Sequence, residues 1–362
     1  MKNKKFELFG DCLIVRGYST SLIYDLGNED YYHIPKKMSM IFDLHMDNVS
    51  LSPDDREYLN SITEELTMLK LGSNNNLDDG FFLSKIDIKW NHPWKISNCI
   101  FYYDKVEMGT FIISLEKLNC QNIQLRFERS ICVSDLEIIS ESIKNSSIKT
   151  CEILSQYSTT EISDIIRETC KNNKRLRRFY FFDSPNNKSI NFAQAIGLHT
   201  TQKTFDNCYI HDDYFAVNIP LFTESQHYNT CLNRKLSIDK DGYIKNCPYM
   251  EQHYGHISNT KIEDVVNLPE FQKWWHIKKD DIDVCKDCEF RHMCTDCRAF
   301  IKDPGNIYSQ PAKCTYNPYI CKWEGEDDYV PVEECGTYSR ETGFVPDKKK
   351  IKRLNKQIWG DE

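Results

Sequence analysis

The middle of the chain alternates between short apolar runs and longer segments with helical periodicity. The apolar runs, which have strand character, start at residues 96, 122, 149 and 176 and are therefore 26, 27 and 27 residues apart. The helical segments between them are 111–118, 134–143 and 160–170. This spacing fits a strand, a loop and a crossover helix, so it predicts parallel strands covered by helices. Further short strands at 204–210 and 214–219 would complete the sheet.

The first 75 residues have a different pattern, in which three short strands precede two helices. The strands are predicted at residues 12–15, 21–26 and 31–34. Ser52 is a suitable N-cap for the second helix, and Pro53 suits its first position. This order predicts a small winged-helix-like module or an ordinary α+β lobe. The polar, turn-rich stretch 73–80 then marks a boundary.

We therefore expect an α/β protein with four consecutive parts. They are a winged-helix-like α+β module (1–75), a degenerate partial β/α barrel (80–225), a cysteine-rich domain (226–326) and a polar, basic C-terminal tail (327–362). The barrel segment contains neither a P-loop nor a GxGxxG sequence, so neither nucleotide-binding motif is available there.

Composition narrows the class of protein. The 362 residues carry 46 Lys and Arg against 54 Asp and Glu, a formal net charge of −8, which argues against a general nucleic-acid binder. Apolar runs fall short of the roughly 20 residues that a membrane helix needs, so no membrane association is expected. The first residues lack a sustained apolar stretch, so we expect no signal peptide and a cytoplasmic protein.

Sixteen cysteines are the most unusual feature of the composition, and eight of them fall between Cys231 and Cys321. The first piece of this cluster is Cys231–x10–Gly242–x4–Cys247, where Asp241-Gly242 is a turn signal that predicts a β-hairpin carrying both cysteines to the same end. The second piece is C–x2–C–x5–C–x2–C. Its cysteines, and the two that follow downstream, are Cys285, Cys288, Cys294, Cys297, Cys314 and Cys321.

Clustered thiols in a chain without an export signal favour metal binding over a disulfide framework. Two C–x2–C pairs can form a tetrahedral zinc site, whereas eight cysteines suffice for two iron–sulfur clusters. Zinc, iron–sulfur, and disulfides or free thiols are therefore all open on spacing alone.

The stretch from Cys231 to Cys321 resembles a SPASM domain, the C-terminal extension of many radical S-adenosylmethionine enzymes that modify peptides. The matching positions are Cys231, Gly242, Cys247, Cys285, Cys288, Cys294 and Cys314. One departure is that two residues separate Cys294 from Cys297, where the family has three.

This resemblance implies two auxiliary 4Fe-4S clusters. The first would take Cys231, Cys247 and Cys297, and its fourth position would be Cys321, another group or an open site. The second would take Cys285, Cys288, Cys294 and Cys314.

Radical S-adenosylmethionine enzymes also carry CxxxCxxC after the first barrel strand, and this chain lacks it. The corresponding loop, residues 102–110, contains no cysteine. We therefore expect neither S-adenosylmethionine binding nor its cleavage, and we assign no catalytic residue.

A barrel-like middle, a SPASM region and no radical motif together resemble the peptide maturases of grasp-with-SPASM systems. That resemblance implies two partners, an ATP-grasp ligase and a ribosomally made precursor peptide, with the leader peptide bound by residues 1–75 as an added strand. Two alternatives stay open: a zinc-stabilised protein–protein interaction module, and an enzyme with an unrecognised cofactor site at the barrel mouth.

Overall fold

The computed structural model describes residues 6–46, 49–73, 85–158, 163–203 and 210–360. The chain divides into two compact units, each built from separate segments. Unit 1 comprises Met1–Trp90, Tyr209–Thr230 and Ile277–Glu362, and unit 2 comprises Asn91–Cys208 and Cys231–His276. The four-part division expected from the sequence does not coincide with these units and stays a prediction.

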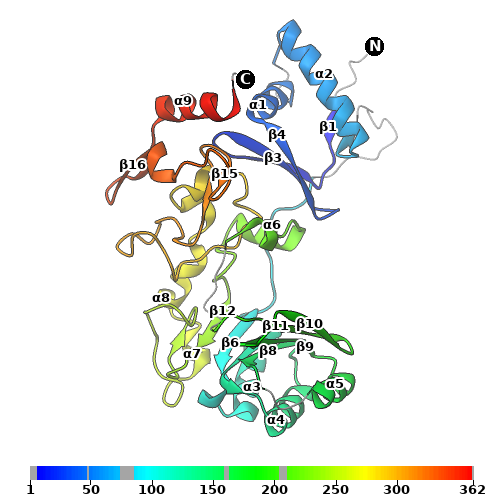
Figure 1. The fold of residues 1–362 in the computed structure, drawn as a ribbon, viewed down its shortest axis with the longest axis vertical. Coiled ribbons are helices and arrows are strands. Elements are labelled where there is room, and N and C mark those ends of the chain that lie inside the picture. Colours follow the sequence, from blue (N-terminus) through cyan, green and yellow to red (C-terminus); the bar gives the residue numbers. More distant parts are fainter. Residues whose placement is uncertain (1–5, 47–48, 74–84, 159–162, 204–209, 361–362) are drawn as a thin grey trace. The chain divides into compact units, whose positions relative to one another are not determined.

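Unit 2 contains an eight-stranded, mostly parallel sheet within its described residues (Figure 1). Its strands are β6 (Asn98–Tyr102), β7 (Asn122–Ser130), β8 (Thr150–Gln156), β9 (Leu176–Phe182), β10 (Lys188–Phe192), β11 (Ala195–His199), β12 (Lys235–Ile238) and β13 (Ile244–Lys245). Their spatial order is β10-β11-β9-β8-β7-β6-β12-β13. The six central strands are parallel, and only β10 and β13 pair antiparallel with their neighbours. The mixed α/β class expected from the sequence is thus confirmed.

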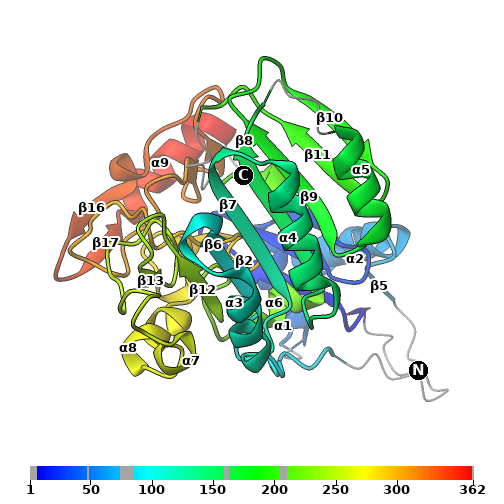
Figure 2. The same ribbon diagram turned by 90° about the horizontal axis from the view of Figure 1, so that it is seen from below.

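Three helices cover one face of this sheet, as Figure 2 shows. They are α3 (Met108–Lys117), α4 (Val133–Lys144) and α5 (Ser163–Asn172). Leu115 on α3 and Ile139 on α4 are fully buried, as are Phe101 and Leu125 on the strands. The alternation over residues 96–182 therefore corresponds to strands covered by helices, as its spacing predicted. Each helix buries its apolar stripe on the sheet.

The strand expected at 214–219 is wrong. The chain there forms a 3₁₀ turn at Asp212–Tyr214 and then helix α6 (Ile219–Ser225), whose N-cap Asn218 accepts a hydrogen bond from the Leu221 N–H at 2.9 Å. The other expected strand, at 204–210, lies almost wholly outside the described residues. Strands β10, β11, β12 and β13 complete the sheet instead.

Unit 1 begins with a three-stranded antiparallel sheet, β2 (Cys12–Arg16), β3 (Thr20–Asp25) and β4 (Asp30–Pro35), followed by α1 (Lys36–Met46) and α2 (Pro53–Met68). These are the elements expected in that order, and Ser52 caps α2 by accepting from the Asp55 N–H at 3.1 Å. A winged-helix fold stays a prediction.

The remaining elements of unit 1 are short. They are β1 (Glu7–Leu8), β5 (Gly72–Ser73), β14 (Tyr316–Asn317), β15 (Lys322–Trp323), β16 (Gly336–Ser339), β17 (Gly343–Pro346) and α9 (Lys348–Trp359). In unit 2, α7 (Ile262–Val265) and α8 (Pro269–Gln272) follow the hairpin of β12 and β13. Among the helices of the described residues, none combines the length and apolar character that crossing a membrane requires.

The sheet of unit 1 is buried on both faces, and this fixes the cysteine-rich segment. Ile23 packs on the side of α1 and α2, whereas its neighbours Leu22 and Tyr24 pack against a cluster that includes Phe290 and Tyr316. The Tyr24 hydroxyl also donates to the Glu289 carbonyl at 2.7 Å. Side chains along β3 alternate between the two faces of the sheet, so one face of β3 packs against Phe290 and Tyr316 of the cysteine-rich segment.

Candidate metal centre

Four of the predicted ligands line one cavity of unit 1: Cys285, Cys288, Cys294 and Cys314. Cys285 opens a 3₁₀ turn that ends at Asp287, and the Cys288 N–H donates to the Cys285 carbonyl at 3.0 Å. This tight turn directs both side chains of the first C–x2–C pair to the same cavity. None of the four forms a disulfide.

The turn before Cys285 is strained. Val284 has φ 66° and ψ −44°, and across it the Cys285 N–H donates to the Asp283 carbonyl at 2.7 Å, which is the pattern of a classic γ-turn. A positive φ is a genuine outlier for a β-branched residue, and such strain concentrates at functional sites. The backbone strain at Val284 thus helps to orient the Cys285 thiol.

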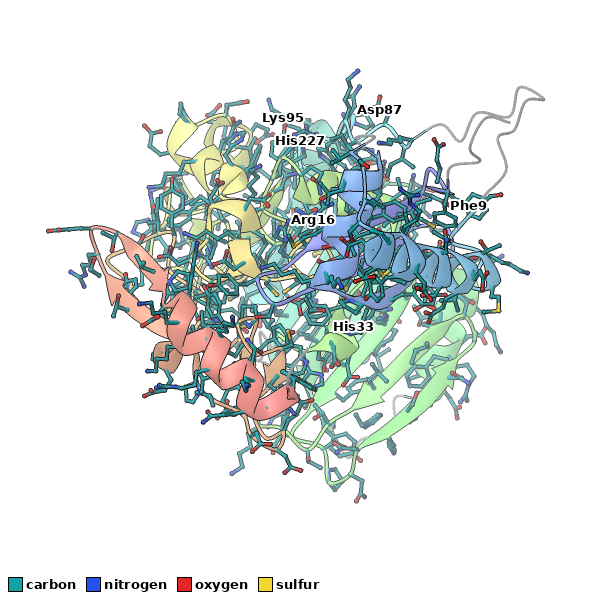
Figure 3. All side chains as sticks on the ribbon, turned by 90° about the horizontal axis from the view of Figure 1, so that it is seen from above. Phe9, Arg16, His33, Asp87, Lys95 and His227 are labelled. Carbon is teal, nitrogen blue, oxygen red and sulfur yellow. The ribbon has the colours of Figure 1, made fainter. Side chains whose placement is uncertain are left out.

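Aromatic rings form much of the cavity wall. Phe290 lies 5.2 Å from Phe215 and 5.0 Å from Tyr316 between ring centroids, and Trp323 lies 4.8 Å from Tyr316. His33 of β4, labelled in Figure 3, packs edge-on against Phe290 at 5.9 Å. This wall helps to bury Cys285 and Cys294, while Cys288 and Cys314 stay half-buried.

Lys279 is a charged residue that lines the cavity and contacts two of these sulfurs. Its Nζ lies 3.5 Å from the Cys294 Sγ and 3.8 Å from the Cys285 Sγ, and the residue is only 4% exposed. Burial lowers the pKa of Lys279, but the Cys285, Cys294 and Asp296 side chains outweigh it and hold that pKa well above its ordinary value. When Cys285 and Cys294 are thiolates, as they are when they bind a metal or cluster, they therefore hold the Lys279 ammonium in its charged form.

A buried ion-pair network anchors this lysine. Asp296 Oδ1 lies 3.6 Å from the Lys279 Nζ, and the other carboxylate oxygen lies 2.5 Å from the Arg298 Nε. The Asn229 amide also donates to Asp296 at 2.7 Å. Because a single buried charge is costly, the network explains how two cations and one carboxylate are tolerated beside the cavity.

Two of the thiols, Cys285 and Cys294, are protonated at neutral pH without a metal. Burial raises the pKa of Cys285 to about 12 and that of Cys294 to about 11, although the Lys279 ammonium lowers both. Since thiolates are the ligands of metals and clusters, binding at this site must release protons.

The spacing of the thiols bears on which metal fits. Among the described residues, only His211, Asp212 and Asp213 bring three ligand atoms of His, Cys, Asp or Glu within 4.8 Å of one another. Tetrahedral zinc with Zn–S bonds of about 2.3 Å would hold its sulfurs about 3.8 Å apart. No three of the four cavity thiols meet this 4.8 Å criterion, and a 4Fe-4S cluster does not require it, because its thiolates bind separate irons.

The first predicted ligand set is divided between the units. Cys231 and Cys247 lie in unit 2, before β12 and after β13, at the end of the hairpin opposite the Asp239–Gly242 turn. The Lys235 Nζ lies 3.6 Å from the Cys231 Sγ. The expected hairpin is confirmed, and Gly242 is required in it because φ is 86° and a Cβ would lie 2.4 Å from the His256 Nε2.

Cys297 and Cys321 belong to unit 1. Cys297 is buried, whereas Cys321 is half-buried with its Sγ 3.9 Å from the Pro318 carbonyl. Neither residue lines the cavity of the other four cysteines. Their roles as ligands therefore stay predictions.

The loop where radical enzymes carry three cysteines has a different role here. Glu107 caps α3, and its carboxylate accepts from the backbone N–H groups of Gly109 at 3.0 Å and Thr110 at 2.8 Å. Hydrogen bonds from the Thr110 hydroxyl and these N–H groups lower the pKa of Glu107. The first turn of α3 is thus built around a carboxylate instead of thiolate ligands.

Sequence reasoning missed Lys279, Lys235 and Val284. The only signal for the lysines was their distance of six and four residues from a cysteine, which no ligand pattern uses. The positive φ of Val284 has no sequence signal, because glycine or asparagine would be expected at such a position.

Comparison with known proteins gives a family match over part of the chain and a weak structural likeness. The crystal structure of Streptococcus suis SuiB bound to S-adenosylmethionine is 11% identical to this chain, with 85% of this chain and 99% of that chain covered, at a TM-score of 0.28. At that TM-score the likeness supports no argument about chemistry. No curated protein matches the chain. Residues 230–289, which include Cys231, Cys247, Cys285 and Cys288, match SPASM, described as an iron-sulfur cluster-binding domain.

Proposed function

We propose that Cys285, Cys288, Cys294 and Cys314 hold a 4Fe-4S cluster. The observation that carries this proposal is their convergence on one aromatic-walled cavity. When bound, such a cluster would supply one-electron chemistry or a rigid crosslink between the four positions. The protein's own part is to fix the thiols and offset the charge of the thiolates.

A second cluster on Cys231, Cys247 and Cys297 is part of the same proposal. The hairpin that brings Cys231 and Cys247 to one end supports it, as does the Lys235 ammonium beside Cys231. Its fourth ligand would be Cys321, another group or a substrate residue.

The wider role that we propose is assistance in the maturation of a ribosomally made peptide, together with an ATP-grasp ligase and without cleavage of S-adenosylmethionine. The resemblance of the cysteine pattern to peptide-modifying systems supports this role, as does the absence of CxxxCxxC from the sequence. The outer strands β2 and β4 of unit 1 offer edges to which a leader peptide could add as a further strand.

Metal analysis of anaerobically purified protein tests the cluster. We expect a brown protein with iron and acid-labile sulfide, and Cys288→Ala should lose the share of one cluster, about four irons per chain. Cys335→Ala is the matched control, because Cys335 is a buried thiol of the same unit whose Sγ accepts from the Asn317 amide at 3.3 Å. Its iron content should equal that of the unaltered protein.

The zinc alternative predicts a different result. Colourless protein with stoichiometric zinc, even after anaerobic reconstitution with iron and sulfide, would refute the cluster proposal.

The maturation role needs a partner experiment. Co-expression with an ATP-grasp ligase and precursor peptide encoded nearby should give a complex, and product formation should fall when this protein is omitted. Unchanged product without this protein would exclude the role. Formation of 5′-deoxyadenosine from S-adenosylmethionine would contradict the proposed lack of radical chemistry.

A further inference from the structure

Lys279 has an environment that an ordinary structural lysine lacks. Its ammonium is buried and lies within 3.8 Å of two cysteine sulfurs, Cys285 and Cys294, on the cavity that four thiols share. A lysine that served only to pair with Asp296 would not need to reach between the sulfurs, because Arg298 already forms the shorter ion pair with that carboxylate.

The charges of the network formed by Lys279, Asp296 and Arg298 do not cancel. Lys279 and Arg298 contribute two positive charges and Asp296 one negative charge, all on buried side chains. The network therefore presents a net positive charge to the thiols, and Lys279 is its member in contact with them. At such short range and low solvent access, a fixed charge acts strongly on a buried redox group.

We propose that Lys279 sets the reduction potential of the cluster on Cys285, Cys288, Cys294 and Cys314 by stabilising its reduced state. This inference rests on the proposed function, since it requires the cluster to be present.

The physical argument concerns one electron. On reduction the cluster takes up one electron from a low-potential donor, no bond breaks, and its negative charge grows by one. A fixed cation beside the thiolates stabilises the more negative state more than the oxidised one, so it raises the potential. Asp296 acts in the opposite direction because its charge is negative.

This argument gives two variants with opposite signs. Lys279→Met removes the cation while keeping an unbranched side chain of similar length, and it should lower the potential. Asp296→Asn keeps the shape of the side chain and removes the negative charge, and it should raise the potential. If the two variants only disturbed the packing, they would not shift the potential in opposite directions.

The test is a redox titration of the anaerobically reconstituted full-length protein with dithionite, followed by the electron paramagnetic resonance of the reduced cluster. Lys278→Met is the matched control, because that neighbouring lysine contacts Asp280 at 3.5 Å and the Gln226 carbonyl at 3.2 Å instead of a sulfur. Its potential should equal that of the unaltered protein. Lys279→Arg keeps the positive charge, so its potential should also stay close to that of the unaltered protein.

The outcomes separate this inference from the proposed function. Unaltered protein without iron and sulfide would refute the cluster itself. An iron-replete Lys279→Met protein with an unchanged potential would refute the role of Lys279 while leaving the cluster intact. If Lys279→Met does not load iron, Asp296→Asn decides: a higher potential supports the proposal, and an unchanged or lower potential overturns it. Failure of both variants to load iron would assign Lys279 a structural role and also overturn it.

Discussion

The four thiols of the unit 1 cavity differ in how much of each side chain water can reach. Cys285 and Cys294 are each 6% exposed, whereas Cys288 and Cys314 are half-buried. Because reaction with an alkylating agent requires both access and a thiolate, these cysteines should behave differently in the cluster-free protein.

Alkylation by iodoacetamide at pH 8, followed by mass spectrometry, measures this difference. In cluster-free protein we expect exposed Cys132 to react first and half-buried Cys314 next. Cys285, Cys288 and Cys294 should react last, because burial raises the pKa of these three thiols. In the loaded protein all four cavity cysteines should be protected while Cys132 still reacts. Equal reactivity of Cys314 in both forms would contradict its role as a ligand.

At this scale the sequence identified the cysteines but not their surroundings. The spacing of Cys285 and Cys288 is local, and the tight turn between them follows from it directly. The position of Lys279 between two sulfurs depends on the Asp296 network, whose members include Asn229 from a distant part of the chain. Such long-range contacts leave no spacing in the sequence.

The start of helix α4 shows how a single residue stabilises an element. Asp135 lies in the first turn of α4, where it accepts from the Cys132 N–H at 2.9 Å and from both terminal nitrogens of Arg129 at 2.6 and 2.9 Å. Burial raises the pKa of Asp135, but these hydrogen bonds outweigh it and hold the pKa below its ordinary value.

Replacement of Asp135 should therefore have a pH-dependent effect on stability. Since the folded pKa is lower than the unfolded value of about 3.9, the stabilisation is complete above that value and is lost as pH falls through the folded pKa. Asp135→Asn should cost about 1–2 kcal/mol at pH 7, because Arg129 is partly exposed, and progressively less below about pH 4. Urea unfolding at several pH values measures this, and a pH-independent difference would contradict it.

The hairpin of β12 and β13 offers a second test. Gly242→Ala combines a positive φ of 86° with a Cβ that would clash with the His256 ring, and it should cost about 1–3 kcal/mol. Gly325→Ala is the control, since Gly325 has φ 96° but nothing within 4 Å of a Cβ, so it should cost only about 1 kcal/mol. Only Gly242→Ala should reduce the iron bound by Cys231, Cys247 and Cys297. Equal iron content in both variants would show that iron binding by this ligand set does not depend on the hairpin.

The elements of residues 96–182 were predictable because their periodicity is local. Strands β6 to β9 and helices α3 to α5 match the sequence rhythm, whereas the parallel pairing of β12 with β6 was not predicted. That pairing joins residues more than 130 positions apart, and neither strand carries a local sign of its partner.

At the scale of the whole molecule, the residues that match SPASM belong to both units. Residues 231–276 belong to unit 2, and the rest of the match, from Ile277, belongs to unit 1. The four proposed ligands of the cavity all lie in the segment Ile277–Glu362 of unit 1, so cluster binding there should stabilise unit 1.

Hydrogen exchange with and without this cluster tests this expectation. Its loss in Cys288→Ala should lower the unfolding temperature and increase exchange in residues 277–323. Exchange in α3, α4 and α5 should change little, since their core consists of apolar side chains of unit 2. A uniform loss of protection over both units would contradict the assignment of the cluster to unit 1.

The hydrogen bond between Tyr24 and Glu289 also has a consequence for how the protein is made. The two residues are 265 positions apart, and Leu22 and Tyr24 of β3 pack against the segment that contains Phe290. At a translation rate of about 5–20 residues per second, one face of this sheet waits on the order of 10 to 50 seconds for its partner. Until its last third leaves the ribosome, the sheet of a nascent chain can therefore be covered on one face only, by α1 and α2.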